Sequence, residues 1–154
     1  MISNGQQQLR SVEVLNSDHA PRTDVKLTLP ALPENVAVVR HVLGAFGQAL
    51  GLSVELIEDL RLAITEACTN VVRHAYAGED PGAVEISIQP QDELVHVTVT
   101  DRGRGIGMSA DTSGPGLGLP LIAAVAHTVD LRPVPGGGSR VAMTFARPCP
   151  GEAA

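Results

Sequence analysis

The sequence has very few aromatic residues and almost no lysine. Its 154 residues include no tryptophan, one tyrosine and two phenylalanines. A hydrophobic core must therefore be built from Val, Leu, Ile and Ala, and a binding surface centred on tryptophan is excluded. Lys26 is the sole lysine and the formal net charge is −6. Because such a chain is repelled by phosphate backbones, we do not expect it to bind nucleic acid.

Cysteines and long apolar runs are also scarce. Cys68 and Cys149 are the two cysteines, and they lie too far apart to suggest a metal site or a disulfide framework. Reduced thiols and a cytoplasmic location are the simplest expectation. No apolar run is long enough to span a membrane, and the polar N-terminal residues lack the apolar core of a signal peptide. We therefore expect no membrane contact.

The residue pattern predicts a single domain over residues 25–147, with polar tails at 1–24 and 148–154. The first tail contains a short alternating stretch, Val12–Leu15, that is compatible with a strand. Within the domain, alternation of apolar and polar residues predicts strands, and three-to-four spacing predicts helices. The strands are expected at 25–31, 83–89, 93–101, 129–134 and 139–146, with a hairpin turn at 90–92, and the helices at 33–50, 54–76 and 119–127.

This order of elements predicts an α+β protein. Hairpin strands separated from the helices favour a two-layer sandwich, in which about three helices cover one face of a mostly antiparallel sheet. Pro33 suits the first turn of the first helix, and Ser53 is a plausible N-cap for the second.

The second predicted helix carries three polar residues at helical spacing. Glu66, Asn70 and His74 stand at i, i+4 and i+8, next to an apolar stripe, where polar groups need partners or a function. Asn70 can donate one oxygen to Mg²⁺ and leave other coordination positions to phosphate and water. Glu66 can accept a proton from a hydroxyl group or water aimed at a terminal phosphate. Taken alone, the pattern favours solvated or structural side chains.

Two glycine-rich segments supply a second group of polar and small residues. Asp101 ends a strand, and its carboxylate can accept a hydrogen bond from the exocyclic amine of adenine. Gly103 and Gly105 allow the backbone to approach a flat base, and backbone amides of the run G-P-G-L-G at 114–118 can hold phosphate at a helix N-terminus. Each segment alone is also compatible with a plain turn. The absence of G-x-x-x-x-G-K-[ST] excludes a Walker-type loop, and the missing strand–helix alternation argues against a dinucleotide fold.

Together the motifs resemble those of a known family. E-A-C-T-N-V-V-R-H-A-Y at 66–76, D-R-G-R-G-I at 101–106 and G-P-G-L-G-L at 114–119 occur in the order found in the GHKL ATPase superfamily, which has the Bergerat fold. Over about residues 25–147 the chain is most similar to the small anti-sigma factors that are serine-protein kinases. The resemblance implies ATP and Mg²⁺ as cofactors and transfer of the γ-phosphate to a serine of an anti-sigma-factor antagonist. It also implies a sigma factor as partner and a homodimer.

The resemblance further implies a role for individual residues. Glu66 would be the general base, Asn70 the magnesium ligand and Asp101 the adenine-binding carboxylate. Ser139 falls where related proteins have a threonine near the nucleotide, and Thr144 is the alternative. The remaining ATP contacts implied are Arg73, His74, Gly103, Gly105, Ile106, Gly114, Gly116, Leu117 and Gly118.

One departure from the family concerns the lid over the phosphates. No Arg or Lys lies between Ile106 and Leu131, so the lid itself offers no cation to the γ-phosphate. Either Mg²⁺ alone suffices or an arginine from elsewhere contributes. This leaves a second hypothesis, a nucleotide-gated binding module without phosphotransfer, and a third, a detached histidine-kinase ATP domain. The arginines that could contribute are Arg73, Arg102, Arg104 and Arg140.

Overall fold

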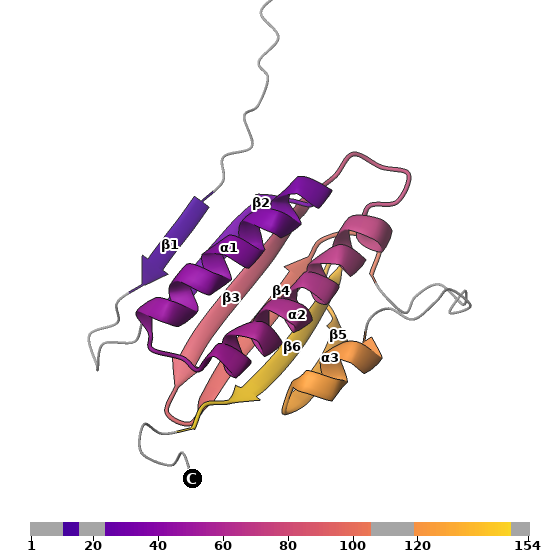
Figure 1. Ribbon diagram of the computed structural model, residues 1–154. Helices are drawn as coiled ribbons and strands as arrows, with labels where there is room; N and C mark the ends of the chain where they lie inside the picture. The colour runs from indigo at the N-terminus through magenta and orange to yellow at the C-terminus, as the bar shows by residue number, and fades with distance from the viewer. Residues whose placement is uncertain (1–10, 16–23, 106–118, 149–154) are drawn as a thin grey trace, which may run out of the picture.

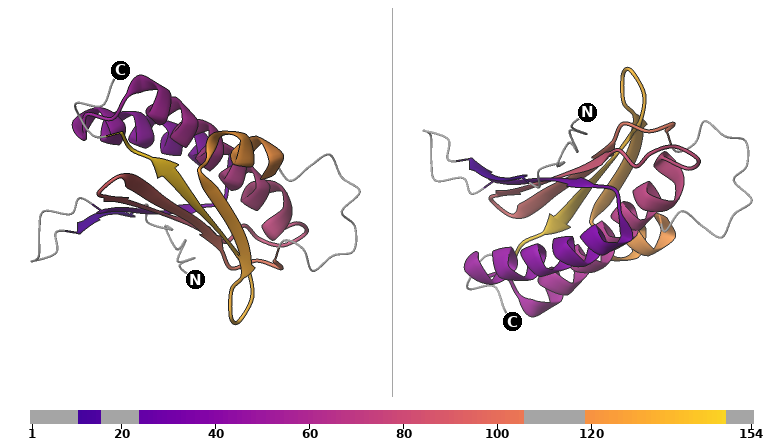
Figure 2. Two further views of the ribbon diagram at one scale, coloured as in Figure 1. Left: turned by 90° about the horizontal axis from the view of Figure 1, so that it is seen from below. Right: turned by 90° about the horizontal axis from the view of Figure 1, so that it is seen from above.

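The computed structural model describes residues 11–15, 24–105 and 119–148, which form a sheet covered by helices on one face (Figure 1). The sheet has six strands in the order β1-β2-β3-β4-β6-β5, and every pairing among the described strands is antiparallel. Figure 2 shows the helices and the sheet as two layers, which confirms the predicted α+β sandwich. The elements are β1 (Ser11–Leu15), β2 (Asp24–Pro30), α1 (Pro33–Ala49), α2 (Val54–Asn70), the π-helical turn η1 (Val71–Ala75), β3 (Ala83–Gln91), β4 (Leu94–Asp101), α3 (Leu119–Val125), β5 (Thr128–Pro133) and β6 (Ser139–Ala146).

Both long helices begin where the sequence provides a start signal. Pro33 occupies the first turn of α1, where its missing N–H group is not needed. The Ser53 hydroxyl accepts the backbone N–H of Leu56 at 3.2 Å and caps α2, as predicted. None of the helices in the described part of the chain is long and apolar enough to cross a bilayer. The strand β1 lies in the segment predicted to be a tail and extends the sheet by pairing with β2.

The β3–β4 hairpin turns later than predicted. Its turn residues are Asp92 and Glu93 rather than 90–92, and Asp92 adopts a left-handed φ of 48°. Asp tolerates this conformation and favours such two-residue turns. Pro90 remains in β3, opposite Val95 of β4. The paired residues of β2 begin opposite Ile88, so Pro90 lies beyond β2 and its missing N–H group interrupts no ladder.

Strand alternation separates an apolar face from a polar face of the sheet. Alternate residues such as Val97 and Met143 point toward the helices and are almost fully buried. The opposite, helix-free face carries polar side chains that line a shallow groove. The groove is lined by residues of the helix-free face, Lys26, Thr28, Glu85, Ser87, Gln89, His96, Thr98, Thr100 and Arg140, and by the strand segments at Leu27 and Ile86, whose side chains belong to the core.

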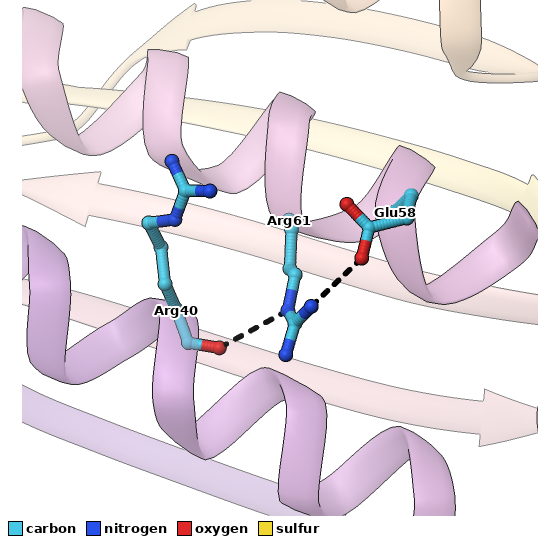
Figure 3. A network of polar contacts seen from close by, with 3 residues as sticks. All are labelled: Arg40, Glu58 and Arg61. Atoms are coloured by element: carbon cyan, nitrogen blue, oxygen red, sulfur yellow. Dashed lines mark hydrogen bonds and ion pairs between the residues drawn. The ribbon is translucent and has the colours of Figure 1, made fainter. Parts of the chain in front are cut away.

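Arg61 fastens α2 to α1 (Figure 3). Its Nε donates to the carbonyl oxygen of Arg40 in α1 at 3.3 Å, and its Nη1 pairs with Glu58 at 2.7 Å. Gly44 makes room for this arrangement, because a Cβ atom at that position would overlap the Arg61 guanidinium. The contact helps to fix the orientation of α2, the helix that carries Glu66 and Asn70.

Cys68 is a core residue of α2. Its thiol is fully enclosed, and burial raises its pKa to about 12. The thiolate required for oxidation or metal binding is therefore strongly disfavoured. Cys68 therefore serves to pack the core of the described domain.

Candidate functional site

A change of helix type follows Asn70. The α-helix α2 ends at this residue and continues as the π-helical turn η1, so the single α-helix predicted as far as Tyr76 is not what forms. Glu66 and Asn70 keep their α-helical relation, one turn apart. His74 lies four residues further on, within the π-helical turn, and is exposed, whereas Asn70 is only 7% exposed. Turns of this kind occur frequently at functional sites.

Asp101 is a buried carboxylate at the end of β4. Its side chain lies on the helix-facing side of the sheet and is only 1% exposed. One carboxylate oxygen, Oδ1, accepts the Gly103 N–H at 2.9 Å, and the backbone N–H of Ser139 also donates to the carboxylate. Burial raises the pKa of Asp101, while these two N–H groups offset part of the rise. The two oxygens can accept about four hydrogen bonds in all, so acceptor capacity remains for a ligand.

The loop after β4 lies directly against η1. The Arg104 backbone N–H donates to the carbonyl oxygen of Ala75 at 3.0 Å, and Arg104 Nε donates to the carbonyl oxygen of His74 at 2.9 Å. Gly103 touches the same stretch, because a Cβ atom there would overlap the Ala75 carbonyl. The structure thus brings the segments 66–76 and 101–105 together, as the motif interpretation requires.

Gly103→Ala is therefore expected to push this loop away from η1. The added methyl group would meet backbone rather than a flexible side chain, so we expect destabilisation of about 1–3 kcal/mol, as for overpacked sites. Nucleotide affinity should fall by more than about tenfold, measured by isothermal titration calorimetry. Gly136→Ala is the matched control. Gly136 has a φ of +89°, so alanine there is strained, but no atom lies within 4 Å of an added Cβ and the loop after β4 is not pushed. Equal affinity in both variants would contradict the expectation.

The start of β6 also packs against Asp101. Gly138 has a φ of +100°, and a Cβ atom there would overlap the Asp101 carbonyl. The next residue, Ser139, is 2% exposed and lies beside Asp101. Thr144, the alternative to Ser139, lies at the other end of β6, where its hydroxyl meets that of Thr128 at 2.5 Å. The sequence contains a signal that favours Ser139 over Thr144. In a strand, side chains two residues apart lie on the same face, and Ser139 is two residues before the buried, apolar Val141.

The arginines considered as phosphate ligands do not all lie on the same side of the sheet. Arg140 lines the groove on the helix-free face and donates from Nε to the Thr100 hydroxyl at 3.2 Å. It therefore lies on the opposite side of the sheet from α2 and is removed as a candidate. Arg73, Arg102 and Arg104 are exposed on η1 and the adjoining loop and remain candidates.

Several predicted site residues lie outside the part of the chain that the structure describes. The roles assigned to them, including the phosphate-side lid, stay predictions. They are Ile106, Gly114, Gly116, Leu117 and Gly118.

The donor set suits a magnesium ion that arrives with a nucleotide. Among the described residues, no group of three or more His, Cys, Asp or Glu side chains could hold a metal ion. A dedicated protein cage is therefore not formed by this part of the chain. Mg²⁺ commonly takes one or two protein oxygens and fills its other positions with phosphate oxygens and water. Asn70, a buried residue at the end of α2, carries an amide oxygen of the kind that fits that use.

Tyr76 and Gly138 are two further residues at the site that the motifs alone do not point to. Tyr76 ends the first motif and is the single tyrosine of an aromatic-poor chain, which was an available signal. Its hydroxyl contacts the residue after Asp101. Gly138 lies in a run of three glycines whose contact with Asp101 depends on the pairing of β4 with β6.

Comparisons with known proteins identify the family. The family model of the histidine kinase-like ATPase domain matches residues 29–145. The serine-protein kinase RsbW of Halalkalibacterium halodurans is 34% identical over 129 residues, covering 74% of this chain and 78% of the relative. The protein of the same name from Bacillus pumilus is 31% identical over 137 residues, covering 78% and 83%. The chain belongs to the histidine kinase-like ATPase domain family and, within it, to the RsbW serine-protein kinases.

A solved structure supports the same assignment. The crystal structure of the RsbU and RsbW domains of a Mycobacterium tuberculosis protein superposes with a TM-score of 0.66 at 26% identity. The match covers 84% of this chain but 34% of that one. The chain thus corresponds to about a third of the larger protein, and the shared part has the same fold.

Proposed function

We propose that this protein is an ATP-dependent serine-protein kinase that acts as an anti-sigma factor. It would transfer the γ-phosphate of ATP to a serine of an anti-sigma-factor antagonist, and it would bind a sigma factor. The observation that carries the proposal is the contact between η1, which continues from Asn70, and the loop that follows the buried Asp101. The meeting of these two motifs supports assigning the candidate metal ligand and the candidate base-binding carboxylate to one site.

Each residue has a chemical task in this proposal. Asp101 accepts a hydrogen bond from the adenine amine, while Gly103 and Gly105, the latter with a φ of +82°, leave space beside the base. Asn70 offers its amide oxygen to Mg²⁺. Glu66, one turn earlier, takes the proton of the substrate serine hydroxyl while the serine oxygen attacks the γ-phosphate. Bound ATP–Mg²⁺ supplies the phosphoryl group and neutralises its charge.

The other predicted contacts belong to the same proposal. Arg73 and His74, both exposed on η1, would face the phosphates, and the backbone around Ser139 would line the base pocket. Ile106 and the glycine-rich segment at 114–118 would close over the nucleotide. The kinase domain would span residues 25–147 and act in the cytoplasm as a homodimer, which light scattering on the purified protein would test.

The direct test is transfer of label from γ-labelled ATP to purified antagonist proteins of the same organism. We expect acid-stable phosphoserine on one antagonist, and co-elution of the unmodified kinase with a sigma factor until unphosphorylated antagonist is added. A protein that binds ATP–Mg²⁺ but labels no antagonist, beside an active RsbW as positive control, would contradict the kinase assignment. Acid-labile label would instead indicate transfer to histidine.

A second function is favoured by one observation on the lid. Since no Arg or Lys lies between Ile106 and Leu131, the lid offers no cation to the γ-phosphate. A protein with this lid could bind nucleotide and sequester a partner without transferring phosphate. Antagonist labelling no faster than ATP hydrolysis in the absence of antagonist would support this alternative.

Asn70→Ala is expected to remove the magnesium-dependent part of nucleotide affinity. The wild-type protein should bind ATP more tightly with Mg²⁺ than with EDTA, because the Asn70 oxygen reaches the metal. In the variant the two affinities should agree within about twofold. Calorimetric titration in both buffers measures the difference. A variant that keeps the full magnesium effect would show that another residue is the ligand.

A further inference from the structure

The hydroxyl group of Tyr76 joins three segments around the site. Tyr76 directly follows η1, and its hydroxyl donates to the carbonyl oxygen of Ala83, the first residue of β3, at 2.7 Å. The same oxygen accepts the backbone N–H of Arg102 at 3.0 Å. Its ring lies against Gly82, where a Cβ atom would overlap it. One side chain therefore connects the end of η1, the start of β3 and the loop after Asp101.

The Tyr76 contact and a contact to Asp101 are made by consecutive backbone N–H groups of the same loop. The Arg102 N–H donates to Tyr76, and the next N–H along the backbone, that of Gly103, donates to the Asp101 carboxylate. Arg104 is held in turn by the carbonyl oxygens of His74 and Ala75. Two of the contacts that the structure describes between these two segments come from side chains, the Tyr76 hydroxyl and Arg104 Nε, and the Tyr76 hydroxyl also bonds to the start of β3.

We propose that Tyr76 is a positioning residue for nucleotide recognition, whose hydroxyl holds the loop 102–104 so that Asp101 is preset to read the adenine amine. The inference rests on the proposed nucleotide site. A carboxylate that is already oriented loses less conformational freedom on binding, and a small displacement of its support weakens recognition. Tyr76 itself touches neither nucleotide nor substrate serine in this scheme.

A purely structural role would have different consequences. If the hydroxyl only stabilised the fold, its removal would lower the melting temperature and affect all nucleotides equally. If it positions Asp101, removal should weaken ATP more than GTP, because guanine has a carbonyl oxygen where adenine has the amine. The ratio of the two affinities therefore separates the two roles.

Tyr76→Phe in the full chain is the test variant, since the ring and its contact with Gly82 are kept. The substitution removes both hydrogen bonds of the hydroxyl group. We expect the Kd and KM for Mg–ATP to rise by about 5–100-fold, with kcat at saturating ATP within about twofold of wild type. The preference for ATP over GTP should fall by a similar factor. Thr128→Val is the control, because it removes a hydroxyl contact at the far end of β6.

A second measurement needs no variant. The chain has one tyrosine and no tryptophan, so its intrinsic fluorescence reports on Tyr76 alone. By thermodynamic linkage, a contact that strengthens nucleotide binding must be strengthened by the nucleotide. We therefore expect Mg–ADP to reduce the quenching of Tyr76 fluorescence by acrylamide. A separate sample of N-acetyltyrosinamide with the same Mg–ADP and acrylamide concentrations corrects for light absorbed by the adenine base.

The outcomes distinguish this inference from the function on which it rests. A wild-type protein that binds no ATP would overturn the proposed function. A Tyr76→Phe protein with an unchanged ATP affinity and ATP:GTP ratio, even with a lower melting temperature, would overturn the positioning role alone. If the variant does not fold, unchanged quenching of the wild-type protein by acrylamide on addition of Mg–ADP gives the same negative answer.

Discussion

Glu66→Gln is expected to slow phosphotransfer to the antagonist by about 10²–10⁴-fold, the usual contribution of a general base. Glutamine keeps the shape of the side chain but cannot take the proton of the attacking serine. Glu66 is half-buried on α2 one turn before Asn70, so its loss should leave the proposed adenine and metal contacts intact. Affinity for Mg–ATP should stay within about twofold of wild type.

Single-turnover transfer from γ-labelled ATP measures the effect, and calorimetry measures binding. Glu58→Gln is the matched control, because Glu58 lies on the same helix but pairs with Arg61 at the surface. Surface ion pairs contribute about 0–1 kcal/mol to stability, so this variant should transfer phosphate at the wild-type rate. If Glu66→Gln retained full activity, the proton would have to leave by another route and the general-base assignment would be wrong.

Asp101→Asn is expected to change stability and affinity in opposite directions. At neutral pH the buried carboxylate of Asp101 is held in surroundings that raise its pKa, so a neutral amide is easier to bury. The free energy of unfolding should therefore be equal or higher in the variant. Loss of a charge-assisted hydrogen bond to the adenine amine, worth about 1.5–3 kcal/mol, should weaken ATP binding about 10–150-fold.

The pH dependence follows from the same raised pKa. Because Asp101 has a higher pKa in the folded than in the unfolded protein, its contribution to stability is fully present below the unfolded pKa and is lost as pH rises through the folded pKa. Nucleotide binding has the opposite sign, since the ionised carboxylate is the better acceptor. ATP affinity of the wild-type protein should fall on acidification through the raised pKa, and Asp101→Asn should lack this component.

Denaturant unfolding at several pH values tests the predicted pH dependence of stability, and ATP titration at the same pH values tests that of nucleotide affinity. GTP provides an internal comparison, because its base lacks the exocyclic amine at the corresponding position and should respond little to the substitution. An Asp101→Asn protein that binds ATP as tightly as wild type would remove Asp101 from the base site. A large loss of stability in the variant would instead indicate that the charge holds the loop together through Gly103 and Ser139.

Local features of the fold could be predicted because they depend on neighbours in the sequence. The Ser53 cap, Pro33 in the first turn of α1 and the alternation of the strands follow from backbone chemistry over a few residues. The hairpin turn lies later than the proline suggests, because Pro90 remains in the β3 register opposite Val95. Pro90 is tolerated in β3 since β2 does not extend that far, which becomes known only once β2 and β3 are paired.

The site was only partly predictable, because spacing along the sequence describes local geometry but not the structure that forms around it. Spacing along the helix correctly linked Glu66 with Asn70, but it could not predict that hydrogen bonding changes to the π type after Asn70. His74 lies within this turn and is exposed, whereas Asn70 is buried. The parity of β6 could have favoured Ser139 over Thr144, because a period of two is already present in the sequence.

By itself, the sequence determined the chemical groups and their local spacing: a carboxylate and an amide one helical turn apart, and a second carboxylate followed by glycines. Only the tertiary structure decided which backbone atoms meet. The loop at 102–104 lies on η1 through Tyr76 and the carbonyl oxygens before it, and Arg140 lies on the far side of the sheet. Contacts between residues about 30 positions apart depend on how the strands pair and how the helices cover them, which short-range propensities do not encode.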